Sequence, residues 1–316
     1  MVIETQQISK TFKVRNNTIE AVAGLDMVVQ AGTIFGLLGP NGAGKTTTMR
    51  MLSTLLAPSG GTATIAGYDL SRQPAQIRRS IGYVAQSGGS EPSMTGRENL
   101  SLQGRLFGLN KTEAGQRAKS LIDSLQMDAF ADRMVKTYSG GQRRRMDLAL
   151  GMVHQPQVLF LDEPTTGLDP QSRLHLWNEV RALRETGTTV FLTTHYLEEA
   201  DALCDRLAIM DHGKIVVDGT PATLKQQIKR DVITVGLAVE QLPQGEDVLC
   251  NQTFVREIHA NADNLQIYVE RGEEVLPSVM RLLDNAQLPV RSVELSRPSL
   301  DDVFLHFTGR SLRQTA

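Results

Sequence analysis

The nine residues 39–47 constrain this chain more than any other stretch. They read Gly-Pro-Asn-Gly-Ala-Gly-Lys-Thr-Thr and fit the phosphate-binding pattern G-x-x-x-x-G-K-S/T at every fixed position. The apolar residues 33–38 before them predict a buried strand, and residues 46–56 contain no helix breaker and predict a helix. Strand, loop and helix in this order form the unit in which such a loop works. The stretch therefore predicts a nucleotide-binding site.

Each part of this loop has a physical reason. Glycines let successive backbone N–H groups converge on one phosphate chain, and the positive end of the following helix points at the same place. Lys45 adds a point charge for the outer phosphates, and the hydroxyl of Thr46 can bind Mg²⁺. We expect the nucleotide to be contacted by Gly39, Pro40, Asn41, Gly42, Ala43, Gly44, Lys45, Thr46 and Thr47.

Composition narrows the class of protein. The chain has 316 residues, enough for two domains, and 41% of them are hydrophobic, as in ordinary globular proteins. Lys and Arg total 33 against 35 Asp and Glu, a formal net charge of −2, so we expect no nucleic-acid partner. No apolar run approaches the roughly 20 residues that span a bilayer.

The start of the chain and its cysteines give two further expectations. Residues 1–4 do not resemble a signal peptide, so we expect the chain to stay in the cytoplasm. Cys204 and Cys250 lie far apart in sequence and suggest neither a disulfide framework nor a metal site. We interpret both cysteines as packing residues.

The first 230 residues predict a mixed α/β domain. Short strands are expected at residues 2–8, 20–29, 62–66 and 81–85, with a polar turn at residues 15–17. Phe12 lies between the first two strands and is either a core aromatic or a face for a nucleobase. An all-helical block at about residues 87–155 interrupts the pattern and predicts a helical subdomain. A hairpin at residues 207–218 and a short helix at 221–229 are expected to close the domain.

The helical block contains an unusual helix start. Ser139 and Gln142 are spaced as a capping box, but Gly140 and Gly141 occupy the first turn. Glycine lowers helix stability by up to about 1 kcal/mol at each interior position, so the pair suggests that another group approaches the backbone closely. A helix N-terminus is a natural phosphate site. We expect the arginines at residues 143–145 to lie on a solvated face.

Polar side chains follow three predicted strands. The apolar residues 158–161 end in Asp162 and Glu163. Mg²⁺ between phosphates needs a carboxylate within reach, which Asp162 can supply, and Glu163 is then free to act as a base on the attacking water. His195 stands just past the strand at 188–193 and is either structural or a hydrogen-bond partner of a γ-phosphate. Gln86 ends another strand, where a glutamine is usually solvated.

Residues 231–316 change character. Strands are expected at residues 232–239, 254–258, 265–269 and 290–295. An amphipathic helix is expected at residues 273–285, and a last helix begins at Leu300, before a polar tail from Gly309. This part has no nucleotide motif and no metal-ligand spacing. It predicts a small α+β packing or interaction domain.

Taken together, these motifs resemble the nucleotide-binding subunit of an ABC transporter, from about residue 2 to residue 230 and in the order of that family. The family's named motifs match as follows: residues 39–47 the Walker A loop, Gln86 the Q-loop, residues 139–142 the signature motif, residues 158–163 Walker B, residues 167–169 the D-loop, and His195 the switch histidine. Phe12 falls where the family places the aromatic that stacks on adenine. The resemblance implies an α/β fold with a P-loop ABC ATPase core, antiparallel β and helical subdomains, and a small C-terminal α+β domain.

The resemblance also implies how the residues act. Two copies form a head-to-tail dimer around two ATP molecules, with the phosphate loop of one copy facing Ser139 and Gly141 of the other. Gly140, Gln142 and Asp169 belong to the same nucleotide-contacting set. Metal binding falls to Thr46, Gln86 and Asp162, which organise Mg²⁺, and catalysis to Glu163 as the general base and His195 as the γ-phosphate ligand. A separate multi-span membrane permease is implied, which places the chain at the cytoplasmic face of the cell membrane as a peripheral subunit.

Two stretches are similar to a narrower group, the daunorubicin-resistance-type drug-exporter ATPases. They are residues 95–100 and 298–305. One departure from the family is Tyr138, where a leucine is usual; we expect the chemistry to survive it. An importer ATPase and a soluble ABC ATPase acting on ribosomes or DNA stay open as alternatives. The soluble machines usually carry two cassettes, long coiled coils or zinc-bearing insertions, which this sequence lacks.

Overall fold

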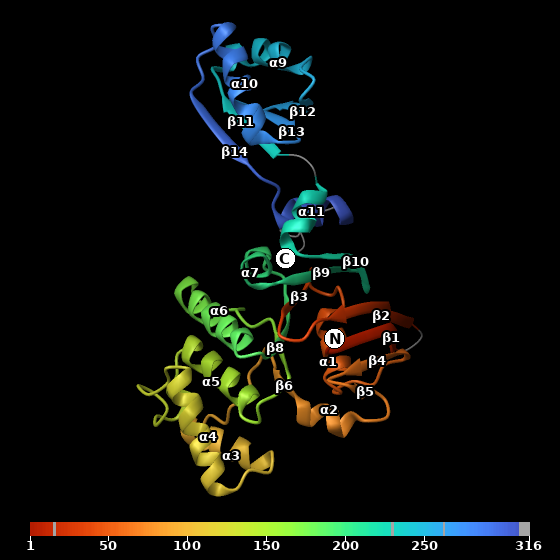
Figure 1. The fold of residues 1–316 in the computed structure, drawn as a ribbon, viewed down its shortest axis with the longest axis vertical. Coiled ribbons are helices and arrows are strands. Elements are labelled where there is room, and N and C mark those ends of the chain that lie inside the picture. The colour runs from red at the N-terminus through yellow and green to blue at the C-terminus, as the bar shows by residue number, and fades with distance from the viewer. Residues whose placement is uncertain (15–16, 229–230, 262, 310–316) are drawn as a thin grey trace. The chain divides into compact units, whose positions relative to one another are not determined.

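The computed structural model describes residues 1–14, 17–228, 231–261 and 263–309. The chain divides into two compact units, Met1–Pro221 and a second that begins at Ala222. Figure 1 shows the elements of both units. Part of the turn expected at residues 15–17, the end of the helix expected at 221–229 and the polar tail after Gly309 lie outside the described residues.

A mostly parallel sheet forms the centre of the first unit (Figure 1). Its strands follow the order β10 (Lys214–Gly219), β9 (Arg206–Asp211), β3 (Ile34–Leu38), β8 (Thr189–Thr194), β7 (Val158–Asp162) and β6 (Ile81–Val84). Every residue of β3, β7 and β8 is buried, as expected where helices cover both faces of a parallel sheet. The covering helices include α1 (Lys45–Leu52), α6 (Pro170–Glu185) and α7 (Leu197–Leu203). The buried strand predicted before residues 39–47 is confirmed, and the helix predicted after them is present but ends at Leu52 rather than at residue 56.

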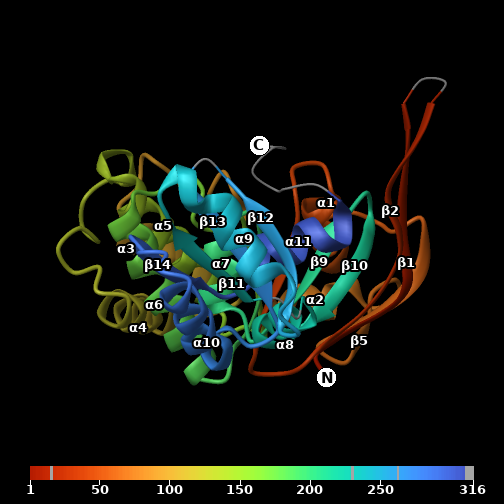
Figure 2. The same ribbon diagram turned by 90° about the horizontal axis from the view of Figure 1, so that it is seen from above.

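An antiparallel sheet packs beside the central one. It has the order β2 (Asn17–Val29), β1 (Ile3–Val14), β4 (Gly60–Ile65) and β5 (Tyr68–Asp69). Both sheets contribute to one hydrophobic core, in which Ile3, Leu25 and Ile65 join Phe35 and Phe160. Strand β1 runs further than residues 2–8, because beyond Ser9 it leaves β4 and continues as a two-stranded ribbon with β2. Figure 2 shows β1 and β2 as this long, twisted ribbon.

The main helices of the helical subdomain begin with side-chain caps. It contains α3 (Gly96–Leu106), α4 (Lys111–Ser124) and α5 (Gly140–Met152), after the short helix α2 (Pro74–Ser80). A capping box begins each of the three, from Thr95, Asn110 and Ser139 respectively. The helix start predicted at residues 139–142 is therefore confirmed. No helix within the described part of the chain is both long and apolar enough to cross a membrane.

The second unit is a small α+β sandwich of one sheet and two helices. The sheet is antiparallel, in the order β12 (Val255–Ala260), β13 (Asn264–Val269), β11 (Asp231–Gly236) and β14 (Ser292–Ser296). Helices α9 (Leu242–Cys250) and α10 (Gly272–Asn285) share its core, and α8 (Pro221–Gln227) and α11 (Leu300–Thr308) flank it in sequence. The strand predicted at 232–239 ends at Gly236, and the prediction missed α9. Of the two cysteines, Cys204 is buried as predicted, whereas Cys250 is exposed, so the packing interpretation of Cys250 is wrong.

We expect Gly82→Ala to destabilise the first unit. Gly82 lies on β6 beneath α5, and a methyl group there would lie 2.2 Å from the carbonyl oxygen of Gly151, so the helix must move. The free energy of unfolding should fall by about 1–3 kcal/mol, measured by urea titration. The matched control is Gly115→Ala on α4, where a methyl group meets nothing within 4 Å; it should stabilise the protein by about 0.5–1 kcal/mol. Equal stabilities for both variants would contradict this packing.

Candidate nucleotide site

The phosphate-binding loop connects β3 to α1 with a backbone that requires glycine. Gly44 has φ of 103° and Gly42 has φ of 81°, the left-handed region that side chains avoid. At Gly39 the neighbours are the reason, because a methyl group would lie 2.2 Å from the carbonyl oxygen of Met210. Within the described residues, no side chain caps the start of α1. Its first N–H groups are therefore available to an anion.

Lys45 is buried at the centre of this loop. Its side chain is 4% exposed, and its ammonium donates to the carbonyl oxygens of Gly39 at 2.8 Å and Pro40 at 3.0 Å. The same Nζ lies 3.7 Å from Oε1 of Glu163. Burial lowers the pKa of Lys45, and the charge of Glu163 acts in the opposite direction. The charge that the loop needs for phosphates is thus held in place by the backbone and by one carboxylate.

Two hydroxyl groups and one carboxylate form an oxygen cluster at the ends of α1, β7 and β8. Oδ1 of Asp162 accepts hydrogen bonds from Thr46 at 3.1 Å and from Thr193 at 2.7 Å. Asp162 is 3% exposed. Hard oxygen donors beside a phosphate site are what Mg²⁺ prefers. The structure therefore brings Thr46 and Asp162 together in a set that fits this ion.

Glu163 is the point at which the predicted polar residues converge. Its Oε2 accepts from Nε2 of Gln86 at 3.2 Å and from the hydroxyl of Thr166 at 3.3 Å. Its Oε1 lies 3.4 Å from Nδ1 of His195 as well as near Lys45. The backbone of Glu163 has φ of 44°, a strained value for a side-chain-bearing residue, and its N–H bonds to Thr193. Strained backbone that neighbours hold in place is a frequent feature of functional sites.

One ring nitrogen of His195 is left without a hydrogen-bond partner among the described residues. It stands between the end of β8 and α7, with its ring 4.1 Å from that of Tyr196. Its Nδ1 lies near Oε1 of Glu163, but the geometry is not that of a hydrogen bond. Among the described residues Nδ1 is buried without a hydrogen-bond partner. A buried polar atom without a partner is costly, which favours a ligand at this position.

The signature residues lie elsewhere. Ser139 and Gly140 are exposed at the start of α5, and within the described residues no hydrogen bond or ion pair joins residues 139–142 to the loop at 39–47. A methyl group at Gly141 would lie 2.7 Å from the hydroxyl of Ser172, so this glycine is needed within the chain itself. Gly140 has no such close neighbour: the nearest atom to its added methyl group would be a carbon of Leu168, at 3.8 Å.

Asp169 caps α6 beside these glycines. It accepts from the N–H of Ser172 at 2.9 Å and from its hydroxyl at 2.6 Å. The hydroxyl hydrogen bond lowers the pKa of Asp169, so the carboxylate is charged. The starts of α5 and α6 thus lie close together where Gly141 faces Ser172.

Phe12 and Tyr138 are both explained by their surroundings. Phe12 lies on β1 with 37% of its surface exposed and Lys10 5.4 Å above its ring, so it is not a core aromatic. Tyr138 donates to the carbonyl oxygen of Phe130 at 2.8 Å, and burial raises the pKa of Tyr138. Its oxygen occupies the space that a methyl group at Gly96 would need. The tyrosine therefore packs where the family usually has a leucine.

The solvated face expected for residues 143–145 is wrong for two of the three. Arg143 is exposed, but Arg144 is buried against the ends of β6 and β7. Arg145 forms an ion pair with Glu179 at 2.8 Å, and burial raises the pKa of Glu179 to about 7. The pattern of apolar residues does not show which arginine faces inward, because residues 146–152 of α5 are buried on all sides of the helix.

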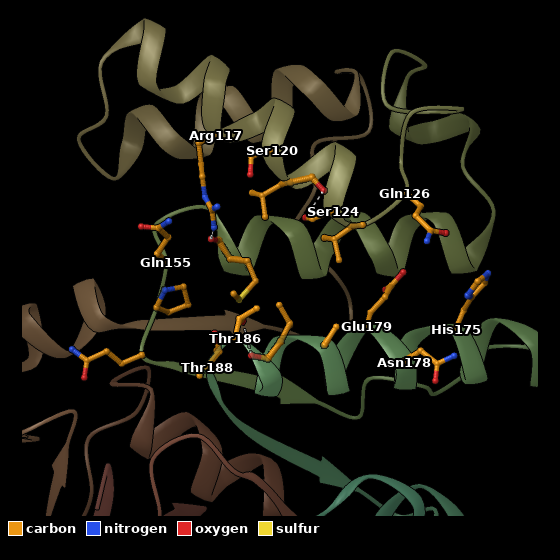
Figure 3. A pocket seen from close by; sticks show the side chains of 18 residues that line it. Arg117, Ser120, Ser124, Gln126, Gln155, His175, Asn178, Glu179, Thr186 and Thr188 are labelled. Carbon is orange, nitrogen blue, oxygen red and sulfur yellow. Dashed lines mark hydrogen bonds between the residues drawn. The ribbon is translucent and has the colours of Figure 1, made fainter.

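A cavity of about 800 Å³ lies away from the predicted site residues (Figure 3). It is lined by α4, by α6 and by residues 152–157. Its charged groups already have partners: Arg117 donates to the carbonyl oxygens of Met152 and Val153, and Glu179 faces Arg145. The charge arrangement for phosphates is at Lys45, so this cavity is not the nucleotide site.

Known proteins resemble this chain in sequence. Residues 22–166 match the ABC transporter family, and residues 219–308 match the C-terminal domain of DrrA1-3-like ATP-binding proteins. The daunorubicin/doxorubicin resistance ATP-binding protein DrrA of Streptomyces peucetius is 44% identical, over 97% of this chain and 92% of its own. The linearmycin resistance ATP-binding protein LnrL of Bacillus subtilis is 36% identical, over 92% and 94%.

Solved structures agree on the fold. An ATP-binding subunit of an ABC transporter superposes with a TM-score of 0.63 at 26% identity, covering 72% of this chain and 93% of its own. A dimeric bacterial ABC transporter cassette gives a TM-score of 0.64 at 24% identity, covering 69% and 98%. The predicted P-loop α/β fold is confirmed.

We expect Thr193→Val to slow ATP hydrolysis. The Thr193 hydroxyl holds Oδ1 of Asp162 and the N–H of Glu163 together, and its loss should lower kcat roughly 10- to 100-fold through misorientation. The control is Thr189→Val on the same strand, whose hydroxyl bonds to the N–H of Gly32 instead. Both variants should lose about 1–3 kcal/mol of stability, but only the first should lose rate in a phosphate-release assay. Equal rates would contradict the assignment.

Proposed function

This chain belongs to the ABC transporter family of ATP-binding proteins, in the daunorubicin-resistance group, and we propose that two copies of it close around two Mg-ATP to power export of a drug or another hydrophobic molecule. It is the ATP-binding and hydrolysing subunit of such a transporter. The observation that carries the proposal is the convergence of Lys45, Gln86 and His195 on Glu163, beside the uncapped start of α1.

The phosphates of ATP would lie on the loop at residues 39–47. The N–H groups at the start of α1 and the ammonium of Lys45 supply positive charge from two directions. Thr46 and Asp162 would hold Mg²⁺. Gln86, whose amide donates to the neighbouring Glu163, would help to organise the ion. The ion, when bound, offsets negative charge on the outer phosphates. Phe12, exposed on the ribbon of β1 and β2, would present a face to adenine.

Glu163 would act as the general base. Gln86 and Thr166 fix Oε2 by hydrogen bonds, which leaves Oε1 toward Lys45 and His195. A carboxylate held in this way can accept the proton of an attacking water. His195, whose Nδ1 lacks a hydrogen-bond partner among the described residues, would bond the γ-phosphate and report its presence. Glu163 would thus accept the proton, and His195 would recognise the γ-phosphate.

A second copy would complete each site. A single phosphate loop leaves one side of the γ-phosphate open to water, and another helix N-terminus can close it. The start of α5, with exposed Ser139 and Gly140, is not used by the chain's own loop. In a head-to-tail dimer it would face the partner's nucleotide, with Gly141, Gln142 and Asp169 close by.

A groove beside Gln86 would receive the membrane subunit. It has a volume of about 390 Å³ and is lined by the end of β6, by Gly88 and Gly89, and by Phe107 and His154. The rings of Phe107 and His154 stack at 3.8 Å, and Leu55 at the rim is 59% exposed. A mostly apolar groove, whose lining also includes Arg78 and Asp147, fits a short amphipathic helix of a permease. Docking there would hold the chain at the cytoplasmic face of the membrane.

We expect Glu163→Gln to abolish hydrolysis without abolishing ATP binding. Removing a general base typically lowers kcat by about 10²–10⁴. Because ATP then persists, the dimer should remain closed and elute as such in size-exclusion chromatography with light scattering. Glu185→Gln, at the exposed end of α6, is the matched control and should hydrolyse normally. A wild-type rate for Glu163→Gln would show that another group is the base.

We expect the protein to co-purify with one multi-span membrane protein from detergent-solubilised membranes. Phe107→Glu should lose that partner because the charge enters the apolar groove, while retaining ATP binding. Met134→Glu, at another exposed apolar residue, is the control and should keep the partner. Stimulation of ATPase activity by a transported drug would then test the direction of transport. Recovery with ribosomes or DNA, or with no partner, would contradict the transport proposal.

A further inference from the structure

We propose that Arg144 and Asp147 are positioning residues, which tie the signature helix α5 to Gln86 and Glu163 of the same chain. The two residues lie three positions apart on α5, so they project from one side of the helix. Both are buried, at 8% and 4% exposure. The inference rests on the function proposed above, because it concerns how the base and the glutamine are held.

Arg144 bridges two strand ends with one guanidinium group. One terminal nitrogen donates to the carbonyl oxygen of Ala85 at 2.8 Å, and the other to that of Asp162 at 3.2 Å. Ala85 directly precedes Gln86, and Asp162 directly precedes Glu163. The planar fork of arginine can make two such bonds in fixed directions, which lysine cannot. The backbone positions of the glutamine and of the base are therefore set by the same side chain.

Asp147 holds the other end of the loop that contains Gln86. Its Oδ1 accepts from the N–H of Gly89 at 3.1 Å and from that of Ser90 at 3.2 Å. A methyl group at Gly88 would lie 2.6 Å from Oδ2 of the same carboxylate, and Gly88 has φ of 78°. The loop thus wraps closely around this carboxylate. Residues 85–90 are attached at both ends to one helix.

The charges of the two residues make the arrangement specific. A buried guanidinium or carboxylate is costly unless it is paired and hydrogen-bonded. Here Arg144 and Asp147 carry opposite charges about one turn apart on the helix, and their hydrogen bonds go to backbone groups of the loop and of the strand ends. An apolar pair would fill the space but would leave the loop and the two strand ends free to shift.

Through the hydrogen bonds of Arg144 and Asp147, helix α5 connects the two nucleotide sites of the proposed dimer. Its N-terminus carries the signature residues, which face the second nucleotide in the proposed dimer. A displacement of α5 on closure moves the carbonyl groups of Ala85 and Asp162 with it. Occupancy of one nucleotide site is therefore transmitted to the glutamine and the base of the other. Arg145, the next residue on the helix, is directed to Gln126 and Glu179 instead.

The test is a double-mutant cycle on the full-length protein. Arg144→Met, Gln86→Ala and the combined variant are compared for kcat and KM of ATP hydrolysis and for affinity to a fluorescent ATP analogue. We expect Arg144→Met to lower kcat about tenfold with analogue affinity within about twofold of wild type, since it acts on the base and not on the loop at 39–47. In the Gln86→Ala background it should lower kcat by clearly less than about tenfold, because the part of its effect that passes through Gln86 is already lost.

Arg145→Met provides the matched control, and its effect should multiply with that of Gln86→Ala. Arg144→Lys keeps the charge but loses the fork, and serves the same cycle if Arg144→Met does not fold. Asp147→Ala should likewise lower kcat with little change in analogue affinity, and its effect should not multiply fully with that of Gln86→Ala. Full multiplication of the Arg144 and Gln86 effects, with Gln86→Ala itself slow, would overturn this inference alone. A wild-type kcat for Gln86→Ala would overturn the role proposed for Gln86 and the inference with it.

Discussion

The site depends on the parallel pairing of β3, β8 and β7. Leu38 pairs with Thr194, and Asp162 pairs with Thr193, so the carboxyl ends of the three strands finish at one edge of the sheet. The residues that follow these ends are the phosphate-binding loop, His195 and Glu163. Because every residue of these strands is buried, a slip in register would move apolar side chains as well as the site. The packing of these buried strands therefore determines where the site residues lie.

Charge at that edge is balanced within a small group. Lys45 and Asp162 are almost fully buried, and burying a charged group is costly unless it is paired and hydrogen-bonded. Contacts offset this cost: Lys45 has two carbonyl oxygens and Glu163, and Asp162 has two hydroxyl groups. The group is stable as a unit, and a polyphosphate with its cation would meet charges that are already oriented. Preorganised charge of this kind is a large contribution to phosphoryl transfer.

The sequence predicted the positions of the phosphate-binding loop, of Asp162 and Glu163 and of His195, because each lies next to a strand whose apolar run is easy to recognise. It did not predict Arg144. Three successive arginines point in directions about 100° apart on a helix, and which one faces inward depends on where β6 and β7 end beneath it. The missed helix α9 has a similar cause, since its Pro243 and Gly245 suppress the local helix signal that its packing restores.

Helix α5 contacts motifs that lie far apart in the sequence. The resemblance predicted that residues 139–142 face the phosphate loop of another copy. Their exposed position at the start of α5 favours another copy, while the next turns of the helix hold residues 85–90. The same loop lines the groove proposed for the membrane subunit, through Gly88 and Gly89. A movement of the proposed permease segment would therefore reach Gln86 through residues 85–90, which Arg144 and Asp147 hold against α5. In the proposed dimer, α5 would then connect the two nucleotides with the membrane subunit.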